Sequence, residues 1–381
     1  MTRIAFYGSS LLSSYGNGAA SYYRGLLRNL AILGYDITFY EPEDLARQQH
    51  QDMAPPDWCR CVVYPSTVDG ARHAATEAAN AEIIIKASNV GCFDDELLAA
   101  VMAVRRPDAL CLFWDLNAPD TLQRLRGDAL HPLRQALPQL DGVMTNGGGP
   151  PVIAGYTALK ARRCTAIYNG LDPESHHPAA AQPRFSCDLG FLGNRLPDRD
   201  ARAEEFFLRP ARLMSARRFM LAGTGWDDKP VPGNVTKLGH ISGPDHNGFN
   251  RSCLAVLNVA RDGMAATGFC PAARLFEAAG AGACLITDQW EGIGYFLKPG
   301  EQVLIARDGK DVADHLGSLT PARAMDIGLS ALEHVLMHHT YANRAAETDA
   351  VLSAELQKKR ETAAAWRLTR RGSRRSAHSR G

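Results

Sequence analysis

Short apolar runs alternate with segments of helical periodicity along most of the chain, which is the pattern of an α/β protein. The run at 109–114 is continuous and apolar, as expected for a parallel strand buried on both faces. Such runs predict strands at 3–7, 36–40, 61–64, 82–86, 109–114, 142–145 and 164–168, and then at 188–192, 218–222, 235–238, 254–259 and 283–287. Helical spacing predicts helices at 19–33, 70–80, 94–105, 152–160 and within 322–356, and a loop is expected at 45–60. The fold class is therefore α/β, with two successive Rossmann-like, doubly wound halves.

An alanine-rich join at 179–183 separates the two halves, and a helix-rich segment follows the second half. The 381 residues are enough for two domains of ordinary size. We expect an N-terminal domain at 1–175, a C-terminal domain at 176–325 and further helices at 326–366. The last residues, 367–381, contain six arginines and little to bury, so a disordered basic tail is expected there.

The charge balance gives no electrostatic reason to expect a nucleic-acid partner. Lys and Arg total 42 and Asp and Glu total 41, for a formal net charge of +1. No secretory apolar region follows Met1, and no apolar run reaches the roughly 18 residues that a membrane span needs. The sequence therefore predicts a cytoplasmic protein without a transmembrane segment.

Neither the cysteines nor the histidines form a recognisable metal motif. The nine cysteines are scattered, Cys59 and Cys61 are the closest pair, and no Cys-x-x-Cys occurs, which favours reduced thiols over a disulfide framework or a zinc site. His176 and His177 are adjacent and have the chemistry of metal ligands, but no cysteine or carboxylate cluster accompanies them. We interpret them as linker residues and predict no metal site.

The first predicted strand runs into a glycine-rich turn at residues 8–18. It contains Gly8, Ser9 and Asn17 but lacks the Gly-x-Gly-x-x-Gly spacing of dinucleotide-binding folds. Glycines allow a close approach of the backbone, and the N–H groups at a helix start suit an anion or a polar acceptor. A plain tight turn is the alternative.

Polar residues also end three other predicted strands of the first half, at Lys86, Asp115 and Asn146. The carboxyl ends of parallel strands form the ligand crevice of open sheets, so these side chains are candidates for a site. For Asp115 the alternative is a turn or N-cap carboxylate. The glycines after Asn146 predict a loop that is either flexible or closely apposed to another segment.

The stretch 268–288 carries the main candidate site of the second half. Pro271 stands where a helix can begin, and Arg274 and Glu277 are three residues apart, so they would share one face of that helix. Glycines end the helix and a short buried strand follows, which puts the charged pair near the crevice of an open sheet. An ordinary surface ion pair is the alternative.

Each predicted strand of the second half ends in glycine or a polar residue. An arginine at such a turn, Arg195, can bind a diphosphate through two parallel hydrogen bonds, and a plain surface arginine is the alternative. The candidate residues at these turns are Gly193, Asn194, Arg195, Gly223, Gly225 and His240.

One sequence resemblance rests on the residues just described. FEAAGAGACLITD followed by PGEQVLIARD resembles the donor-binding segment of group 1 glycosyltransferases of GT-B architecture, and it is most similar to the CgeB-like family, named after a spore-coat maturation glycosyltransferase. The segment WD-x-x-AP-x-TL at 114–122 is also similar to that family. The resemblance implies two Rossmann-like domains facing a cleft, with C-terminal helices packed back on the N-terminal domain. Many members carry a second Glu eight residues before Glu277, where this chain has Phe269.

The resemblance also implies roles for the candidate residues. In the second half the strand-end turns would enclose a nucleotide-sugar donor, with Arg195 on the diphosphate, Glu277 on the ribose, and Arg274 orienting Glu277 or reaching a phosphate. The first half would bind the acceptor, an unknown glycan, lipid or protein, and Asp115 would be the general base if the enzyme inverts the anomeric centre. The wider group mostly retains configuration, so a retaining, metal-independent bacterial hexosyltransferase is expected, with the nucleotide-sugar as substrate and no cofactor. Lys86 is the second catalytic candidate, and the remaining candidates, on the acceptor side, are Gly8, Ser9, Asn17 and Asn146.

Three other functions stay open from the sequence. A nucleotide-sugar epimerase shares the two-lobed architecture and would differ in its free products. A nicotinamide oxidoreductase is disfavoured because no strand is followed by the dinucleotide glycine pattern. A catalytically silent carbohydrate- or nucleotide-binding scaffold of the same fold is favoured by the absence of the first Glu, at Phe269.

Overall fold

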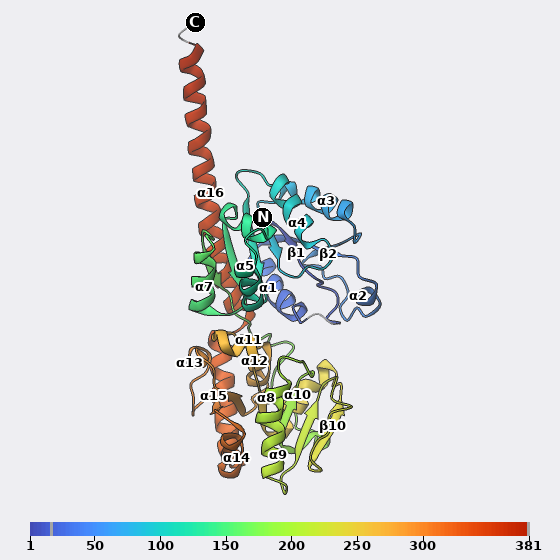
Figure 1. The fold of residues 1–381 in the computed structure, drawn as a ribbon. Helices are drawn as coiled ribbons and strands as arrows, with labels where there is room; N and C mark the ends of the chain where they lie inside the picture. Colours follow the sequence, from blue (N-terminus) through green and yellow to red (C-terminus); the bar gives the residue numbers. More distant parts are fainter. Residues whose placement is uncertain (16–17, 379–381) are drawn as a thin grey trace. The chain divides into compact units, whose positions relative to one another are not determined.

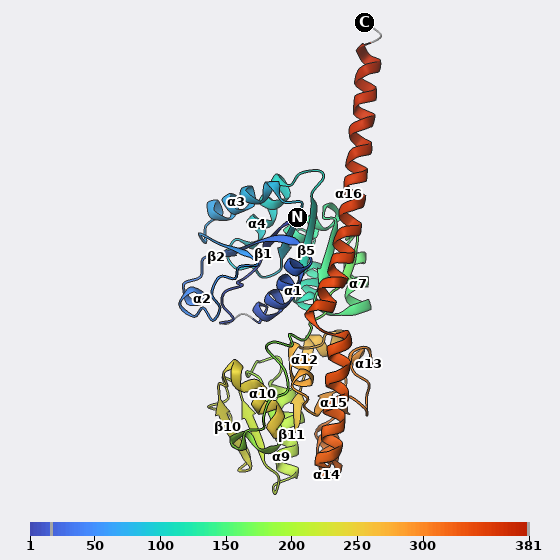
Figure 2. The same cartoon turned by 180° about the vertical axis from the view of Figure 1, so that it is seen from behind.

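The computed structural model describes residues 1–15 and 18–378, and the chain divides into two compact units (Figures 1 and 2). The first unit comprises Met1–Asn146, Val152–Ile167 and Arg344–Gly381, and the second comprises Gly147–Pro151 and Tyr168–Asn343. The boundary after the first half thus lies at residue 167 rather than at 175. The segment predicted as 326–366 is divided between the units, because its first helix belongs to the second unit.

A seven-stranded parallel sheet forms the centre of the first unit, in the order β3-β2-β1-β4-β5-β6-β7. Its strands are β1 Thr2–Tyr7, β2 Tyr35–Pro42, β3 Arg60–Tyr64, β4 Ile83–Ala87, β5 Leu110–Asp115, β6 Gly142–Thr145 and β7 Cys164–Ala166. Every residue of β5 is buried, as its continuous apolar run predicts. Strand order reverses beside β1, so the sheet is doubly wound as expected.

Helices connect these strands, and one of them lies in the stretch expected to be a loop. The helices are α1 Ala20–Ile32, α2 Leu45–Gln49, α3 Val68–Glu77, α4 Asp94–Val104, α5 Ala118–Gly127, α6 Pro132–Ala136 and α7 Gly149–Ala158, with 3-10 turns at Ala78–Asn80 and Leu137–Gln139. The expected loop was wrong for α2 because Asp44 caps it, accepting hydrogen bonds from the backbone N–H groups of Ala46 and Arg47. Without an apolar face, this short helix leaves no periodic signal in the sequence.

The second unit is built on a six-stranded parallel sheet in the order β10-β9-β8-β11-β12-β13. Its strands are β8 Cys187–Leu192, β9 Phe219–Ala222, β10 Val235–Gly239, β11 Cys253–Asn258, β12 Leu285–Asp288 and β13 Leu304–Ala306. This order is the doubly wound order of Rossmann-like sheets, with the switch point between β8 and β11. The predicted α/β, doubly wound fold class is therefore confirmed for both units.

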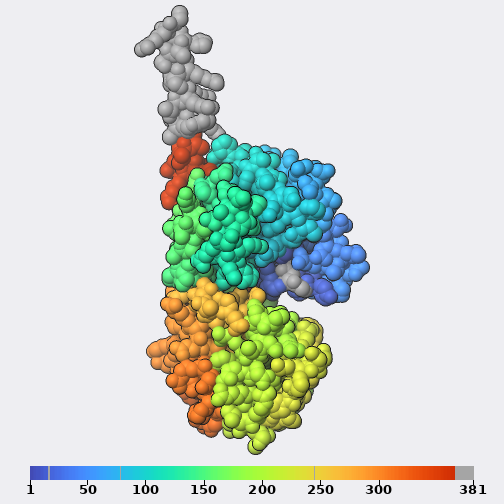
Figure 3. Space-filling view, viewed as in Figure 1, coloured from blue at the N-terminus to red at the C-terminus, as the bar shows by residue number. Residues whose placement is uncertain are grey.

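Helices cover both faces of the second sheet. They are α8 Asp200–Ala203, α9 Arg209–Leu213, α10 Gly243–Ser252, α11 Asp262–Thr267, α12 Ala273–Gly280, α13 Ile293–Phe296, α14 Gly309–Ser318 and α15 Pro321–His338, with a 3-10 turn Pro183–Phe185 and a π-helical turn Glu204–Leu208. Segments around α13 and α14, drawn orange, occupy one side of the unit, and those around α9 and β10, green to yellow, the other (Figures 1 and 3). Helix α12 begins at Ala273 rather than at Pro271, because the backbone at Ala272 is still extended.

The last helix, α16 Tyr341–His378, runs alongside the first unit in both ribbon views (Figures 1 and 2). Tyr35 donates its hydroxyl to Asp349 at 2.7 Å, and Arg163 forms an ion pair with Glu355. The helix continues through residues 367–378, where the composition predicted a disordered tail. Arginine, a good helix former, makes up five of these twelve residues, so a helix already begun extends through them. No helix in the described parts of the chain is long and apolar enough to cross a membrane.

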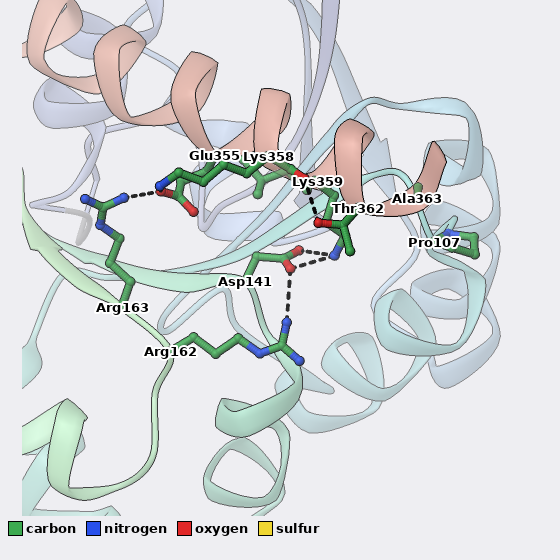
Figure 4. Close-up of a pocket in the computed structure, with 10 residues that line it drawn as sticks. Pro107, Asp141, Arg162, Arg163, Glu355, Lys358, Lys359, Thr362 and Ala363 are labelled. Carbon is green, nitrogen blue, oxygen red and sulfur yellow. Dashed lines mark hydrogen bonds and ion pairs between the residues drawn. The ribbon is translucent and has the colours of Figure 1, made fainter. Parts of the chain in front are cut away.

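Charged side chains fasten α16 to the amino-terminal edge of the first sheet (Figure 4). The Lys359 ammonium lies 2.6 and 2.7 Å from the two carboxylate oxygens of Asp141, which also accepts a hydrogen bond from the backbone N–H of Cys111 at 2.8 Å. Beside these contacts lies a cavity of about 800 Å³. Leu110 lines it at the first position of β5, so this cavity is at the edge opposite the carboxyl ends of the strands.

We expect the Lys359→Ala substitution to lower the free energy of unfolding by about 1–2 kcal/mol, since Asp141 then keeps a charge with few partners in a nearly buried position. The matched control is Lys358→Ala, whose partner Glu355 also pairs with Arg163. Because Lys358 is largely exposed, its loss should cost about 0.5 kcal/mol or less. Urea denaturation of the full chain measures both, and equal effects would contradict the assignment.

Candidate functional site

Two turns at the carboxyl ends of β8 and β9 face each other in the second unit. The backbone N–H of Gly193 donates to Ala222 at 2.8 Å, and the Asn194 side-chain oxygen accepts from the N–H of Thr224 at 2.9 Å. Gly223 has a φ of +125°, and a Cβ built on it would lie 2.5 Å from the carbonyl carbon of Gly193. The glycine is therefore needed both for its conformation and for the close approach of the two turns.

Arg195 lies at the first of these turns, and its guanidinium is held between two carboxylates. Its Nε lies 2.7 Å from Asp200 and its Nη1 lies 3.1 Å from Asp228. The hydrogen bond with Asp200 is the main reason why the pKa of Arg195 is raised. A diphosphate that bound this guanidinium would compete with the two carboxylates for its N–H groups, so the expected diphosphate role has a competitor within the fold.

Arg199, at the same turn, has a buried N–H without a hydrogen-bond partner among the described residues. The sequence pattern did not single out this arginine. It donates to the backbone carbonyl of Asn194 and lies over the ring of Phe191, 5.7 Å from its centroid. Its buried Nε has no hydrogen-bond partner among the described residues, and burial lowers the pKa of this arginine. The only sequence signal was its position four residues after Arg195 in the same turn.

Arg274 and Glu277 lie on one face of α12, as their spacing predicts, with Nη1 3.6 Å from the carboxylate. Arg274 also donates from Nη2 to the side-chain oxygen of Asn250 at 2.8 Å. Asn250 is fully buried on α10, and its Nδ2 has no hydrogen-bond partner in the described parts of the chain. This arrangement differs from a surface ion pair, because a helix and a neighbouring buried amide hold the arginine.

The charges of Arg199 and Arg274 act on each other within the second unit. Burial is the largest cause of the lowered pKa of Arg274, Glu277 opposes this lowering, and the positive charge of Arg199 adds to it. Two partly buried guanidinium groups that repel each other, one of them with an unpaired N–H, form a place where an anion with several oxygens is stabilised.

Two histidines stand beside Glu277. His176 follows β7 in the connection to β8, and His246 lies on α10. One nitrogen of each and one oxygen of Glu277 all lie within 4.8 Å of one another. The interpretation of His176 as a plain linker residue is therefore incomplete, because the fold supplies the carboxylate that the sequence around it lacks. His177 is exposed and takes no part in this group.

The position of the missing first Glu, Phe269, is structurally constrained. Its φ is +49°, unusual for a residue with a side chain, and its carbonyl accepts a hydrogen bond from the N–H of Gly148 at 2.7 Å. A Cβ on Gly149 would lie 2.8 Å from the Phe269 side chain, and one on Gly147 would lie 3.3 Å from Cys270. The glycine loop after Asn146 is thus closely apposed to another segment, which is one of the two forms that its sequence predicts.

The charged candidates of the first unit are enclosed. Asp115 has no exposed surface and accepts hydrogen bonds from Tyr156 at 2.5 Å, from Thr121 at 3.1 Å and from the N–H of Asn117 at 3.0 Å. Burial raises its pKa. In this structure it joins β5 to α5 and α7, which is the turn-carboxylate alternative, and it offers no surface to an acceptor hydroxyl.

Lys86 is equally enclosed in the first unit, at 3% exposure. Its ammonium lies 2.7 Å from Asp94 and over the ring of Phe113, and burial lowers its pKa. The lysine therefore ties β4 to α4. Like Asp115, it holds elements of the first unit together, and it also lines a small pocket of about 100 Å³.

The other candidates are separate from these groups. A Cβ on Gly8 would collide with the ring of Phe39, so this glycine serves packing. Ser9 is buried, and its carbonyl accepts a hydrogen bond from Arg47 at 2.9 Å. Asn17 lies outside the described residues. His240 is exposed just after β10, and Gly225, with a φ of +82°, lies against Arg195.

Known proteins resemble this chain in two ways: a family model matches part of its sequence, and solved structures share its fold. Residues 199–350 match a protein-family model described as glycosyl transferase-like. No curated protein matches the sequence. Among solved structures, sucrose-phosphate synthase from Thermosynechococcus elongatus superposes with a TM-score of 0.69 at 13% identity, covering 93% of this chain and 99% of that one.

Two further neighbours were solved with nucleotides or nucleotide-sugars. HepE of Anabaena, in complex with UDP and glucose, has a TM-score of 0.64 at 12% identity and covers 93% of this chain and 100% of its own. The T4 phage enzyme BGT, in complex with its UDP-glucose substrate, has a TM-score of 0.57 at 10% identity, covering 93% and 98%. These likenesses establish the two-domain GT-B fold of glycosyltransferases. Arg199, Arg274 and Glu277 lie within the segment that matches the glycosyl transferase-like model, whereas Arg195 lies just before it.

Proposed function

We propose that the protein is a glycosyltransferase that moves a sugar from a nucleoside-diphosphate sugar to an acceptor, and that its second unit holds the donor. The observation that carries this proposal is that two partly buried arginines, Arg199 and Arg274, act on each other through their charges, with Glu277 3.6 Å from Arg274. Their charges are only partly balanced, and the buried N–H groups of Arg199 and Asn250 lack partners among the described residues. A diphosphate with an attached ribose supplies the acceptor oxygens that such groups need.

Each group has a distinct role in this proposal. The guanidinium groups of Arg199 and Arg274 stabilise the negative charge that develops on the diphosphate as the sugar leaves. Glu277 accepts hydrogen bonds from the ribose hydroxyls, and the glycines at 193 and 223 let the diphosphate approach the backbone of the two turns. Arg195, in contrast, orders the turn through Asp200 and Asp228, and these carboxylates compete with the diphosphate for its guanidinium.

The finer features of the proposal rest on the sequence resemblance. Similarity of FEAAGAGACLITD to the CgeB-like family supports membership of that group, a retaining reaction without a metal, and a cytoplasmic location in a bacterium. The enclosed state of Asp115 is consistent with retention, since a retaining transfer does not require a protein base at the acceptor. Two structural neighbours bind UDP or UDP-glucose, which makes these the first ligands to test here.

Calorimetric titration of the full chain with UDP, GDP, TDP and ADP and their glucose conjugates tests donor binding. We expect saturable binding of at least one nucleotide, weakened about tenfold or more by Arg199→Ala, because a hydrogen bond to a charged group contributes roughly 1.5–3 kcal/mol. The control is Arg307→Ala, an exposed arginine paired with Asp311. If no nucleotide or nucleotide-sugar binds, the proposed function is wrong.

A catalytically silent nucleotide-sugar-binding scaffold is a second candidate, favoured by Phe269 in place of the first Glu and by the enclosed Asp115 and Lys86. The two functions predict the same binding but different turnover. Slow release of free sugar from the bound donor, or transfer to acceptors in a cell extract, supports the enzyme. Binding with neither would support the scaffold.

A further inference from the structure

The group formed by His176, His246 and Glu277 has the composition of a metal site, and its two histidines have no role in the proposed reaction. Two imidazole nitrogens and one carboxylate form the ligand set that Zn²⁺ takes in several catalytic sites, with a fourth position left for water. The three residues come from three separate segments, and all are half-buried. Their ligand atoms lie within 4.8 Å of one another, and ligands of one tetrahedral ion lie about 3.3 Å apart at the Zn–N and Zn–O lengths. Modest rotation of the side chains is enough to close that difference.

The hydrogen bond of His246 leaves one nitrogen available to an ion. Its Nε2 lies 3.2 Å from the backbone carbonyl of Ile241, and a carbonyl oxygen only accepts, so Nε2 carries the proton. Nδ1 then holds a lone pair. An imidazole that donates one N–H to a backbone carbonyl and offers its other nitrogen is the usual arrangement of histidines that bind metals.

The backbone around the group is fixed by contacts that do not involve the three side chains. Asn247 donates from Nδ2 to the carbonyl of Ser175 at 3.0 Å, which holds the turn before His176 against α10. The N–H of His176 donates to the carbonyl of Asp172 at 2.9 Å. On α12, a Cβ at Gly280 would lie 3.0 Å from the carbonyl oxygen of His176, so the turn and the helix are in close contact. Fixed backbones place the three side chains together before any ion arrives.

We propose that His176, His246 and Glu277 bind a divalent transition-metal ion of the Zn²⁺ class. Two imidazole ligands favour Zn²⁺, Co²⁺ or Ni²⁺ over Mg²⁺ and Ca²⁺, which prefer oxygen ligands. The bound ion occupies the carboxylate of Glu277 and so excludes the ribose hydroxyls. The ion therefore inhibits donor binding and has no part in catalysis. This consequence rests on the proposed function, whereas metal binding does not.

Metal binding is measured on the tag-free full chain after treatment with a chelator. Titration with Co²⁺ is expected to give visible absorption bands of a tetrahedral or five-coordinate site at one ion per chain, and Zn²⁺ is expected to displace it. His176→Ala and His246→Ala should each weaken binding at least tenfold. If one of these variants does not fold, as judged by circular dichroism, the other still tests the site.

Two controls separate this site from other possible ligands. His177→Ala changes the neighbouring exposed histidine and should leave the affinity unchanged. His338→Ala changes another histidine cluster, in which the rings of His334 and His338 lie 4.9 Å apart, and it should also have no effect. Loss of the Co²⁺ bands in His338→Ala would overturn the proposal. So would an intense near-ultraviolet band from cysteine ligation, or the absence of binding by the wild type.

The inhibitory consequence is read from UDP titrations with and without Zn²⁺. We expect Zn²⁺ to weaken UDP binding to the wild type at least tenfold and to have little effect on His176→Ala. Chelation of Zn²⁺ by UDP itself is the same in both proteins, so their difference reports the site. If the ion binds but UDP binds neither protein, the donor function fails while the metal site stands. If UDP binds and the ion does not, only the metal proposal is wrong.

Discussion

The Gly223→Ala substitution is expected to lower the free energy of unfolding by about 2–6 kcal/mol and to abolish nucleotide binding. The substitution has two additive costs. The first is backbone strain, because an L side chain at a φ of +125° costs roughly 1–3 kcal/mol. The new Cβ would also lie 2.5 Å from the carbonyl carbon of Gly193 and 3.0 Å from the N of Asn194, and overpacking of this kind costs about 1–3 kcal/mol more. Because the obstacle is backbone, relief requires that the two turns separate.

Gly239→Ala is the matched control for that experiment. Gly239 has a φ of +66° at the end of the neighbouring strand β10, but a Cβ there meets no atom within 4 Å. Only the strain of the left-handed backbone remains, roughly 1–2 kcal/mol. Chemical denaturation and UDP calorimetry of both variants separate conformational strain from the close approach of the two turns. Equal losses would mean that the contact between the turns is unimportant.

The Glu277→Ala substitution should weaken donor binding by about 1–3 kcal/mol, or roughly 5- to 150-fold, because the ribose hydroxyls lose their acceptor. Removal of the carboxylate also leaves the partly buried Arg274 with Asn250 as its remaining side-chain partner. We therefore expect a smaller loss with Glu277→Gln, which keeps an acceptor oxygen. Calorimetry with UDP and with UDP-glucose measures both variants.

Glu301→Ala is the control for Glu277→Ala, since Glu301 pairs with Lys298 at the same three-residue spacing but is largely exposed. Its affinity for UDP should match that of the wild type. Wild-type affinity in Glu277→Ala itself would remove this glutamate from the donor site. That result would leave the role of Arg199 intact, because its test depends on a different side chain.

The two arginines of the β8 turn illustrate a limit of pattern reading. A strand followed by Gly-Asn-Arg predicts an arginine near a phosphate, and the sequence analysis therefore chose Arg195. Whether a guanidinium has free donors depends on which carboxylates reach it. Asp200 and Asp228 reach Arg195, and Asp228 comes from a turn 33 residues later. No such ion pair involves Arg199 among the described residues, and this difference between the two arginines is visible only in the folded structure.

Local physics determined much of the fold from the sequence alone. The continuous apolar run of β5 requires burial on both faces, and strand–helix alternation across the chain requires parallel sheets, so the two doubly wound units followed. The three-residue spacing of Arg274 and Glu277 likewise placed them on one face of α12, because helical periodicity depends only on residues close together in the sequence. Each of these features is encoded within a short window.

Tertiary structure alone decided which distant groups meet. Asp115 became a buried anchor because Tyr156, 41 residues later, reaches its carboxylate. His176 lacked any nearby ligand in the sequence, and the packing of α10 and α12 brought His246 and Glu277 beside it. Contacts between residues that are distant in the sequence depend on how the turns and helices pack at one sheet edge. No local pattern of apolar and polar residues predicts that packing.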